Sequence, residues 1–257
     1  METINLTAPK NYGEMTEKQI RYVAALLIAG TPEETIWTKC FIRFTGIKPL
    51  CDSDGDYLFS KRKLKGFFKL TVEEVNSFSK KMDFLTKSYI GIRPVSKIVI
   101  LKPCDELLCD TTFLQYLEAE NYYQKYLFTK DVSHLNMLIG TLYQKGKDYD
   151  NSLTEKRAKF IEYYSTEVER LIVLMWMVGV KDYFSKKFKY LFKRIESDEN
   201  NDVAPDMYRI IQDQVRMLSD GDVTKRNKVL QSNTWDALDE MDSKIREAKE
   251  MEKRNNI

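Results

Sequence analysis

Helical spacing of apolar residues is the first pattern along the chain. Thr16 and Gln19 have the spacing of a capping box, and the apolar residues after them share one helical face as far as Gly30. A second apolar stripe begins after Pro32, which suits the first turn of a helix, and stops at Gly46. The pattern therefore predicts two consecutive helices near the start of the chain.

Strand-like segments lie on both sides of these helices. Residues 3–8 alternate apolar with polar side chains, and 97–101 form a short apolar run that ends before a proline. Between them, 57–59 and 67–70 are rich in aromatic and aliphatic residues and are separated by the basic turn 61–65. We expect these two segments to form a β-hairpin.

From about Thr111 onward the pattern is almost entirely helical. Apolar residues recur at helical spacing over 113–126 and 135–142, and a long helix is predicted from Leu153 through the apolar run 171–178. Further helices are expected over 180–195, over 207–218 and in the tail. The predicted fold class is α+β and predominantly α-helical, with a small N-terminal mixed region that contains a β-hairpin, followed by a helical bundle.

The sequence contains no internal repeat and no clear linker, with only 10 glycines and 6 prolines. We therefore expect a single α+β domain over 1–257. The alternative is two lobes, a mixed α/β lobe over 1–108 and a helical lobe over 109–257, with a polar helical tail over 233–257.

Charge and hydropathy narrow the class of protein. Lys and Arg number 41 against 39 Asp and Glu, and a net charge of +2 argues against a protein that coats nucleic acid. The apolar run 171–180 is too short to span a bilayer, and the first residues lack the pattern of a signal peptide. We expect a cytoplasmic protein that does not contact membranes.

Residues that build active sites are scarce. The chain has one histidine, His134, and four cysteines without paired spacing. The acidic stretch 52–56 lacks the glycine and the glutamate of a calcium loop, since Tyr57 and Lys63 hold those positions. No catalytic residue, metal site or cofactor is assigned, and the chain is predicted not to be an enzyme. An unfamiliar carboxylate site stays open as a rival, because Asp and Glu are abundant.

A basic and aromatic segment over 180–195 offers an alternative function. It holds six Lys and Arg residues against Asp182, interleaved with aromatic rings, and together with the turn 61–65 it could bind nucleic acid. However, Phe184 and Phe188 fall on one helical face, which places the rings in a core and the lysines in solvent. The acidic segment 196–206 also cancels the charge locally.

The C-terminal tail is the predicted contact surface. Trp235, Leu238, Met241 and Ile245 recur at helical spacing along an otherwise polar segment with acid-before-base pairs four residues apart. Such a narrow stripe can dock on a partner protein. The alternative is that Trp235 fills the protein's own core.

Several stretches resemble a family of uncharacterised proteins encoded in tail-module regions of phages and prophages of gut bacteria. They read INLTAP at 4–9 with MTEKQIRYV at 15–23, YLF at 57–59, YLEAENYY at 116–123 and LSDGDVT at 218–224. The resemblance implies a role in phage tail assembly, as a chaperone or a tail structural protein. It also implies other tail or virion proteins as partners, and a location in the cytoplasm of the bacterial host or in the virion. It implies no catalytic residue. The expected function is therefore protein–protein interaction.

The absence of paired ligand spacing leads to a first prediction. Purified protein is expected to retain no stoichiometric zinc or calcium after dialysis, and all four cysteines should react with a thiol reagent once the chain is denatured. Elemental analysis and thiol counting check this. One metal ion retained per chain would contradict it and point to 52–56 or to the region of Cys104 and Cys109.

Overall fold

The computed structural model describes residues 6–53, 56–61, 67–146, 148–192 and 206–255. The helices and strands are η1 Tyr12–Glu14, α1 Glu17–Ile28, α2 Glu33–Thr45, β1 Ile47–Ser53, β2 Asp56–Lys61, β3 Phe67–Thr71, α3 Val72–Ser79, η2 Lys80–Met82, α4 Phe84–Lys87, β4 Lys102–Pro103, α5 Phe113–Thr129, α6 Val132–Leu142, β5 Tyr143–Gln144, η3 Asn151–Leu153, α7 Thr154–Tyr164, α8 Glu167–Lys187, α9 Met207–Leu218, η4 Val223–Lys225, α10 Arg226–Leu230 and α11 Thr234–Asn255. The predicted fold class, α+β and mostly helical, is confirmed.

The chain divides into two compact units, Met1–Arg93 and Pro94–Ile257. The boundary lies before 108, because the segment 94–108 is bonded to the second unit. The Cys104 amide donates to Leu142 O at 2.9 Å, and the Tyr143 hydroxyl donates to Val95 O at 2.8 Å. The single domain over 1–257 stays a prediction.

Threonine caps fix where three helices begin. Thr16, Thr71 and Thr166 each accept a hydrogen bond from the amide three residues on, and the side chain at that position bonds back to the threonine amide. The start at Thr16 is confirmed as predicted. The cap at Thr166 corrects the sequence analysis, because α7 ends at Tyr164 and α8 begins afresh instead of continuing one long helix from Leu153.

The first unit contains a three-stranded antiparallel sheet in the order β1-β2-β3, within the residues described. The predicted hairpin of β2 and β3 is confirmed, with Phe59 opposite Phe68. Strand β1 is absent from the sequence analysis, because Pro49 and Asp52 interrupt the pattern of a strand. Residues 6–8 form no strand, and 3–5 lie outside the described residues.

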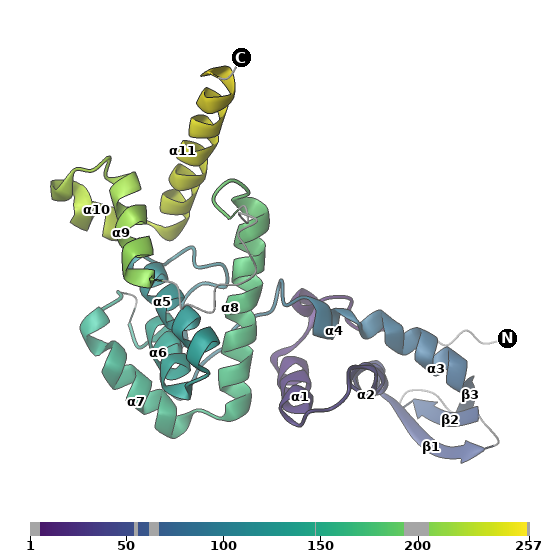
Figure 1. Cartoon of the computed structure of the whole chain (residues 1–257). Helices are drawn as coiled ribbons and strands as arrows, with labels where there is room; N and C mark the ends of the chain where they lie inside the picture. The colour runs from purple at the N-terminus through teal and green to yellow at the C-terminus, as the bar shows by residue number, and fades with distance from the viewer. Residues whose placement is uncertain (1–5, 54–55, 62–66, 147, 193–205, 256–257) are drawn as a thin grey trace. The chain divides into compact units, whose positions relative to one another are not determined.

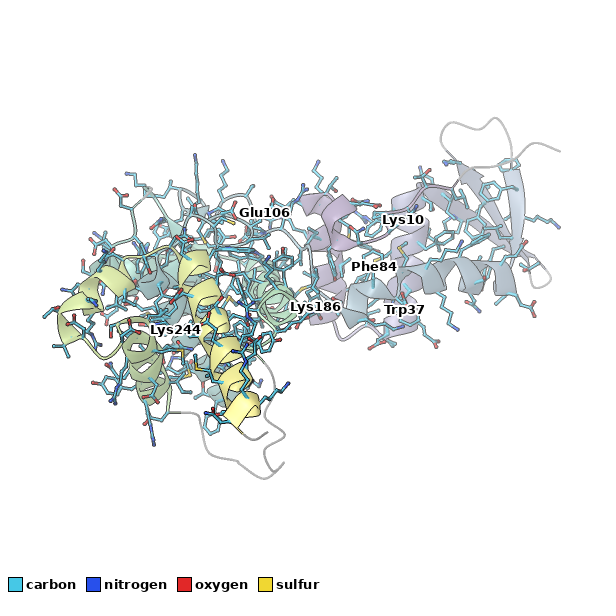
Figure 2. The ribbon with its side chains drawn as sticks, turned by 90° about the horizontal axis from the view of Figure 1, so that it is seen from above. Lys10, Trp37, Phe84, Glu106, Lys186 and Lys244 are labelled. Carbon is cyan, nitrogen blue, oxygen red and sulfur yellow. The ribbon has the colours of Figure 1, made fainter. Side chains whose placement is uncertain are left out.

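The helices of the first unit enclose a small aromatic core. Tyr12 is buried and its hydroxyl donates to Leu85 O at 2.8 Å. Phe41 of α2 stacks on Phe78 of α3 with ring centroids 5.8 Å apart. The Trp37 indole donates to the Thr86 hydroxyl at 3.2 Å, which ties α2 to α4 (Figure 2).

Helix α8 runs along one side of the second unit, next to α5 and α6 (Figure 1). Trp176 is buried, and its indole N–H donates to Glu106 O at 2.8 Å. The strand predicted over 97–101 is wrong. Val99 has a φ of 55° there, and Ile98 and Leu101 exchange backbone hydrogen bonds across a tight turn. Among the described residues, no helix is long and apolar enough to cross a membrane.

Helices α6 and α7 approach closely at Gly140. An added Cβ there would lie 3.0 Å from Ala158 N and 3.0 Å from Thr154 O, both backbone atoms that cannot rotate away. The buried Arg157 uses the same contact, because its Nε donates to Gly140 O at 2.6 Å. The pairing of these two helices therefore depends on the missing side chain.

This contact predicts the effect of a single methyl group. Gly140→Ala should force α6 and α7 apart and lower the free energy of unfolding by about 1–3 kcal/mol. Gly146→Ala is the control, since an added Cβ meets nothing there. Denaturant melts of the two variants measure the difference, and equal stability would show that the helices separate without cost.

Candidate protein-binding groove

The tail residues predicted to bind a partner lie largely inside the second unit. The Trp235 indole donates to Leu107 O at 2.8 Å, and its ring contacts Phe184 and Phe188 at centroid distances of 5.6 and 5.7 Å. Leu238 and Met241 are buried, and Ile245 is half-buried. Trp235 itself is half-buried, with its ring packed against these two phenylalanines of its own unit. A role of the four residues in binding a partner stays a prediction.

Beyond Lys249 the tail helix is exposed. Asp242 accepts hydrogen bonds from the amides of Tyr190 and Leu191, and the Lys244 amine donates to Met217 O at 2.9 Å (Figure 2). The last turns of α11 project beyond the other helices of the unit (Figure 1). The last turns of α11 are therefore open to solvent, whereas the stripe from Trp235 to Ile245 is buried or half-buried.

The basic segment over 180–195 follows the solvated-face interpretation as far as it is described. Phe184 and Phe188 are buried, while Lys186, Lys187 and Lys189 are exposed. Residues 180–187 form the end of α8, which stops at Lys187, and no separate helix begins in the described residues that follow, 188–192. Residues 193–195 lie outside the described part of the chain, as does the turn 61–65 apart from Lys61.

The thiols are poor ligands and nucleophiles. Burial raises the pKa of the Cys40 thiol to about 12 and raises the pKa of Cys104 well above its usual value. Burial, followed by a hydrogen bond to Asp105, also raises the pKa of Cys109. These thiols therefore stay protonated near neutral pH. Within the described residues, no group of three His, Cys, Asp or Glu side chains could hold a metal ion.

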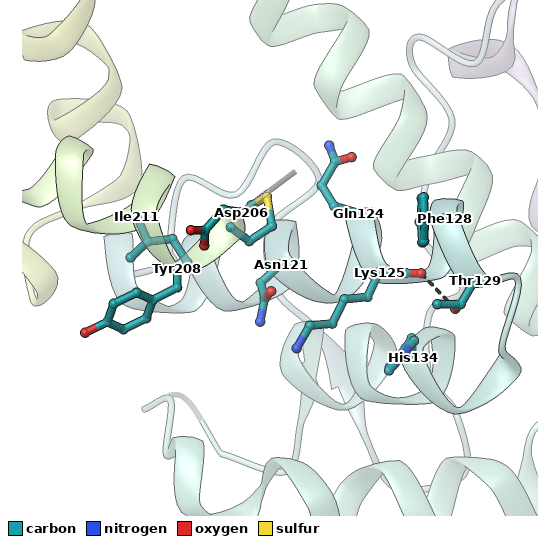
Figure 3. A pocket seen from close by; sticks show the side chains of 10 residues that line it. Asn121, Gln124, Lys125, Phe128, Thr129, His134, Asp206, Tyr208 and Ile211 are labelled. Carbon is teal, nitrogen blue, oxygen red and sulfur yellow. Dashed lines mark hydrogen bonds between the residues drawn. The ribbon is translucent and has the colours of Figure 1, made fainter. Parts of the chain in front are cut away.

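One hollow of the second unit is a groove of about 600 Å³ between α5 and α9 (Figure 3). Helix α5 contributes one face, at spacings of three, four and seven residues. Helix α9 contributes its first two turns, and His134 of α6 also lines the groove. The lining residues are Asn121, Gln124, Lys125, Phe128, Thr129, His134, Asp206, Met207, Tyr208 and Ile211.

Two exposed aromatic rings line this groove from opposite helices. Phe128 on α5 is 57% exposed, and Tyr208 on α9 is 75% exposed. Ile211 lies beside Tyr208 (Figure 3), and both Ile211 and Met207 are half-buried. Large apolar side chains gathered in an open groove are typical of an interaction site.

Local hydrogen bonds set both helices of the groove. Helix α9 begins at Asp206, whose carboxylate accepts from the Arg209 amide at 3.1 Å. Helix α5 ends at Lys130, which adopts a left-handed conformation, and the Thr129 hydroxyl donates to Lys125 O at 2.8 Å. The polar side chains that line the groove are two amides, two hydroxyls and three ionisable groups: Asn121, Gln124, Thr129, Tyr208, Lys125, His134 and Asp206.

The groove has a signal in each helix but none that joins them. The apolar face of α9 is visible in the sequence, and so is the face of α5. They are about 80 positions apart, so only the fold shows that they share a cavity. The chain matches no protein-family model, no curated protein and no solved structure.

The buried half of α11 predicts a sharp contrast along one helix. Leu238→Ala should lower the free energy of unfolding by about 2–5 kcal/mol, because it leaves a cavity between α11 and its neighbours. Met251→Ala, at a residue that is 62% exposed, should change it by less than about 0.5 kcal/mol. Thermal and denaturant melts compare them, and a stable Leu238→Ala variant would return the whole helix to the role of a contact surface.

Proposed function

We propose that this chain is a non-catalytic binding protein whose α5/α9 groove holds an amphipathic helix of a partner protein. The observation that carries the proposal is the pair of exposed rings, Phe128 and Tyr208, on the two walls of one apolar groove. Aromatic side chains that bury fully on binding dominate the energy of many interfaces.

The dimensions of the groove favour a helix. The lining residues of α5 run from Asn121 to Thr129, which spans about 12 Å of helix axis. Two turns of a partner helix would place two or three apolar anchors between the rings. Asn121 and Gln124 can bond to polar groups at the edge of that helix.

The resemblance to phage tail-module proteins suggests which partners to expect. Of the stretches that carry it, 116–123 lies within α5, and 218–224 begins at the last residue of α9 and continues beyond that helix. On this proposal the partner is a tail or virion protein, and the chain acts in tail assembly as a chaperone or structural component.

Site-specific photocrosslinking in the native host tests the proposal. A photoreactive phenylalanine analogue at Tyr208 should give one discrete protein adduct. The same analogue at Tyr163, which is 82% exposed on α7, is the matched control and should give none. Mass spectrometry of the adduct identifies the protein and the attached segment.

A second substitution gives the measurement its direction. Phe128→Asp should remove the adduct at Tyr208 without lowering the melting temperature, because the ring it replaces is mostly exposed. Equal labelling at Tyr163 and Tyr208, or an adduct that survives Phe128→Asp, would contradict the groove. An adduct between Tyr208 and nucleic acid would contradict a partner protein as the occupant of the α5/α9 groove.

A further inference from the structure

The sheet of the first unit has one covered face and one open face. On the covered face Ile47 and Phe59 are buried, and Phe68 stacks on Phe59 at 5.9 Å. On the open face β3 exposes every second residue. Phe67 lies on that face and is 70% exposed, more than any other phenylalanine among the described residues.

Strand register brings two lysines to the same face. Lys48 lies opposite Ser60, and Ser60 lies opposite Phe67, so these three form one row across the sheet. Lys69 is in the next row, opposite Leu58. Lys48 and Phe67 are thus about 10 Å apart across two strand spacings, and Lys69 is about 7 Å from Phe67 along its strand.

The charge around this face is positive. Lys48 and Lys69 are exposed, and neither forms an ion pair with a side chain that the structure describes, a set that does not include the side chains of residues 51–56. The first unit carries 15 Lys and Arg against 11 Asp and Glu, and the second carries 26 against 28. The near-neutral total of the chain therefore hides a basic unit. Asp56 lies opposite Thr71, in the row next to Lys69 and two rows from Phe67.

We propose that this open face binds single-stranded nucleic acid, with a base stacked on Phe67 and phosphates held by Lys48 and Lys69. An exposed ring between unpaired ammonium groups matches the two parts of a nucleotide. Lysine is depleted in the cores of protein interfaces, which argues against a protein as the occupant. A duplex keeps its bases stacked inside, so the ring selects single strands.

Fluorescence anisotropy of the full chain with a labelled 20-nucleotide oligothymidine tests this inference. Binding is expected at about 1–100 µM in 50 mM salt and should weaken as salt rises. Phe67→Ala should raise Kd about tenfold, because it removes one stacked base. Lys48→Gln with Lys69→Gln should lower the slope of log Kd against log salt by about 1.4, the value for two phosphates of a single strand.

Matched controls separate this face from the rest of the chain. Tyr163→Ala and the pair Lys186→Gln with Lys187→Gln remove a ring and two lysines from the second unit, and both should leave Kd unchanged. Loss of binding only in the Lys186 and Lys187 variant would overturn the proposal in favour of α8.

Three other results would also overturn it. These are no binding at 50 mM salt, equal affinity for duplex, and a Phe67→Ala variant that changes the sedimentation mass but not Kd. The last would make the face a protein interface. Because Phe67 is exposed, circular dichroism should show that its variant folds normally.

Discussion

Two tryptophans hold consecutive carbonyls of one loop, and the arrangement of the second unit depends on these hydrogen bonds. Trp176 of α8 donates to Glu106 O, and Trp235 of α11 donates to Leu107 O, both at 2.8 Å. The next residue, Leu108, adopts a left-handed conformation with a φ of 60°. Such a backbone shape persists in a leucine only when its surroundings hold it. The two indoles supply both the apolar cover and the donors.

The groove inherits its geometry from that loop. The Thr234 amide at the start of α11 donates to Thr111 O, just before the first residue of α5. This hydrogen bond holds the start of α11 next to the start of α5. Lys244 of α11 in turn bonds to Met217 O and to Asp220 at the end of α9. Helix α9 is therefore positioned against α5 through α11. The tail helix therefore fixes the orientation of the two helices that form the groove.

The sequence predicts local structure well where a short-range interaction decides it. Thr16 and Gln19 mark a helix start, and Thr166 and Glu169 have the same spacing at the start of α8. Periodicity identifies which face of a helix is apolar, but not what covers that face. Trp235 therefore fitted both a contact with a partner and a place in the protein's own core. The α5/α9 groove and the open sheet face arise from pairings between distant segments. No local spacing could have shown them.

The division of α11 into a buried and an exposed half means that its backbone opens unevenly. Its first two turns are secured by Leu238 and Met241, so their amides exchange with solvent only when the unit itself unfolds. After Lys249 only intrahelical bonds and surface charges remain, and opening there costs little. Protection against hydrogen exchange should thus fall stepwise along a single continuous helix. A fluorescent reporter attached near Met251 would sense docking at the end of α11 without disturbing the fold.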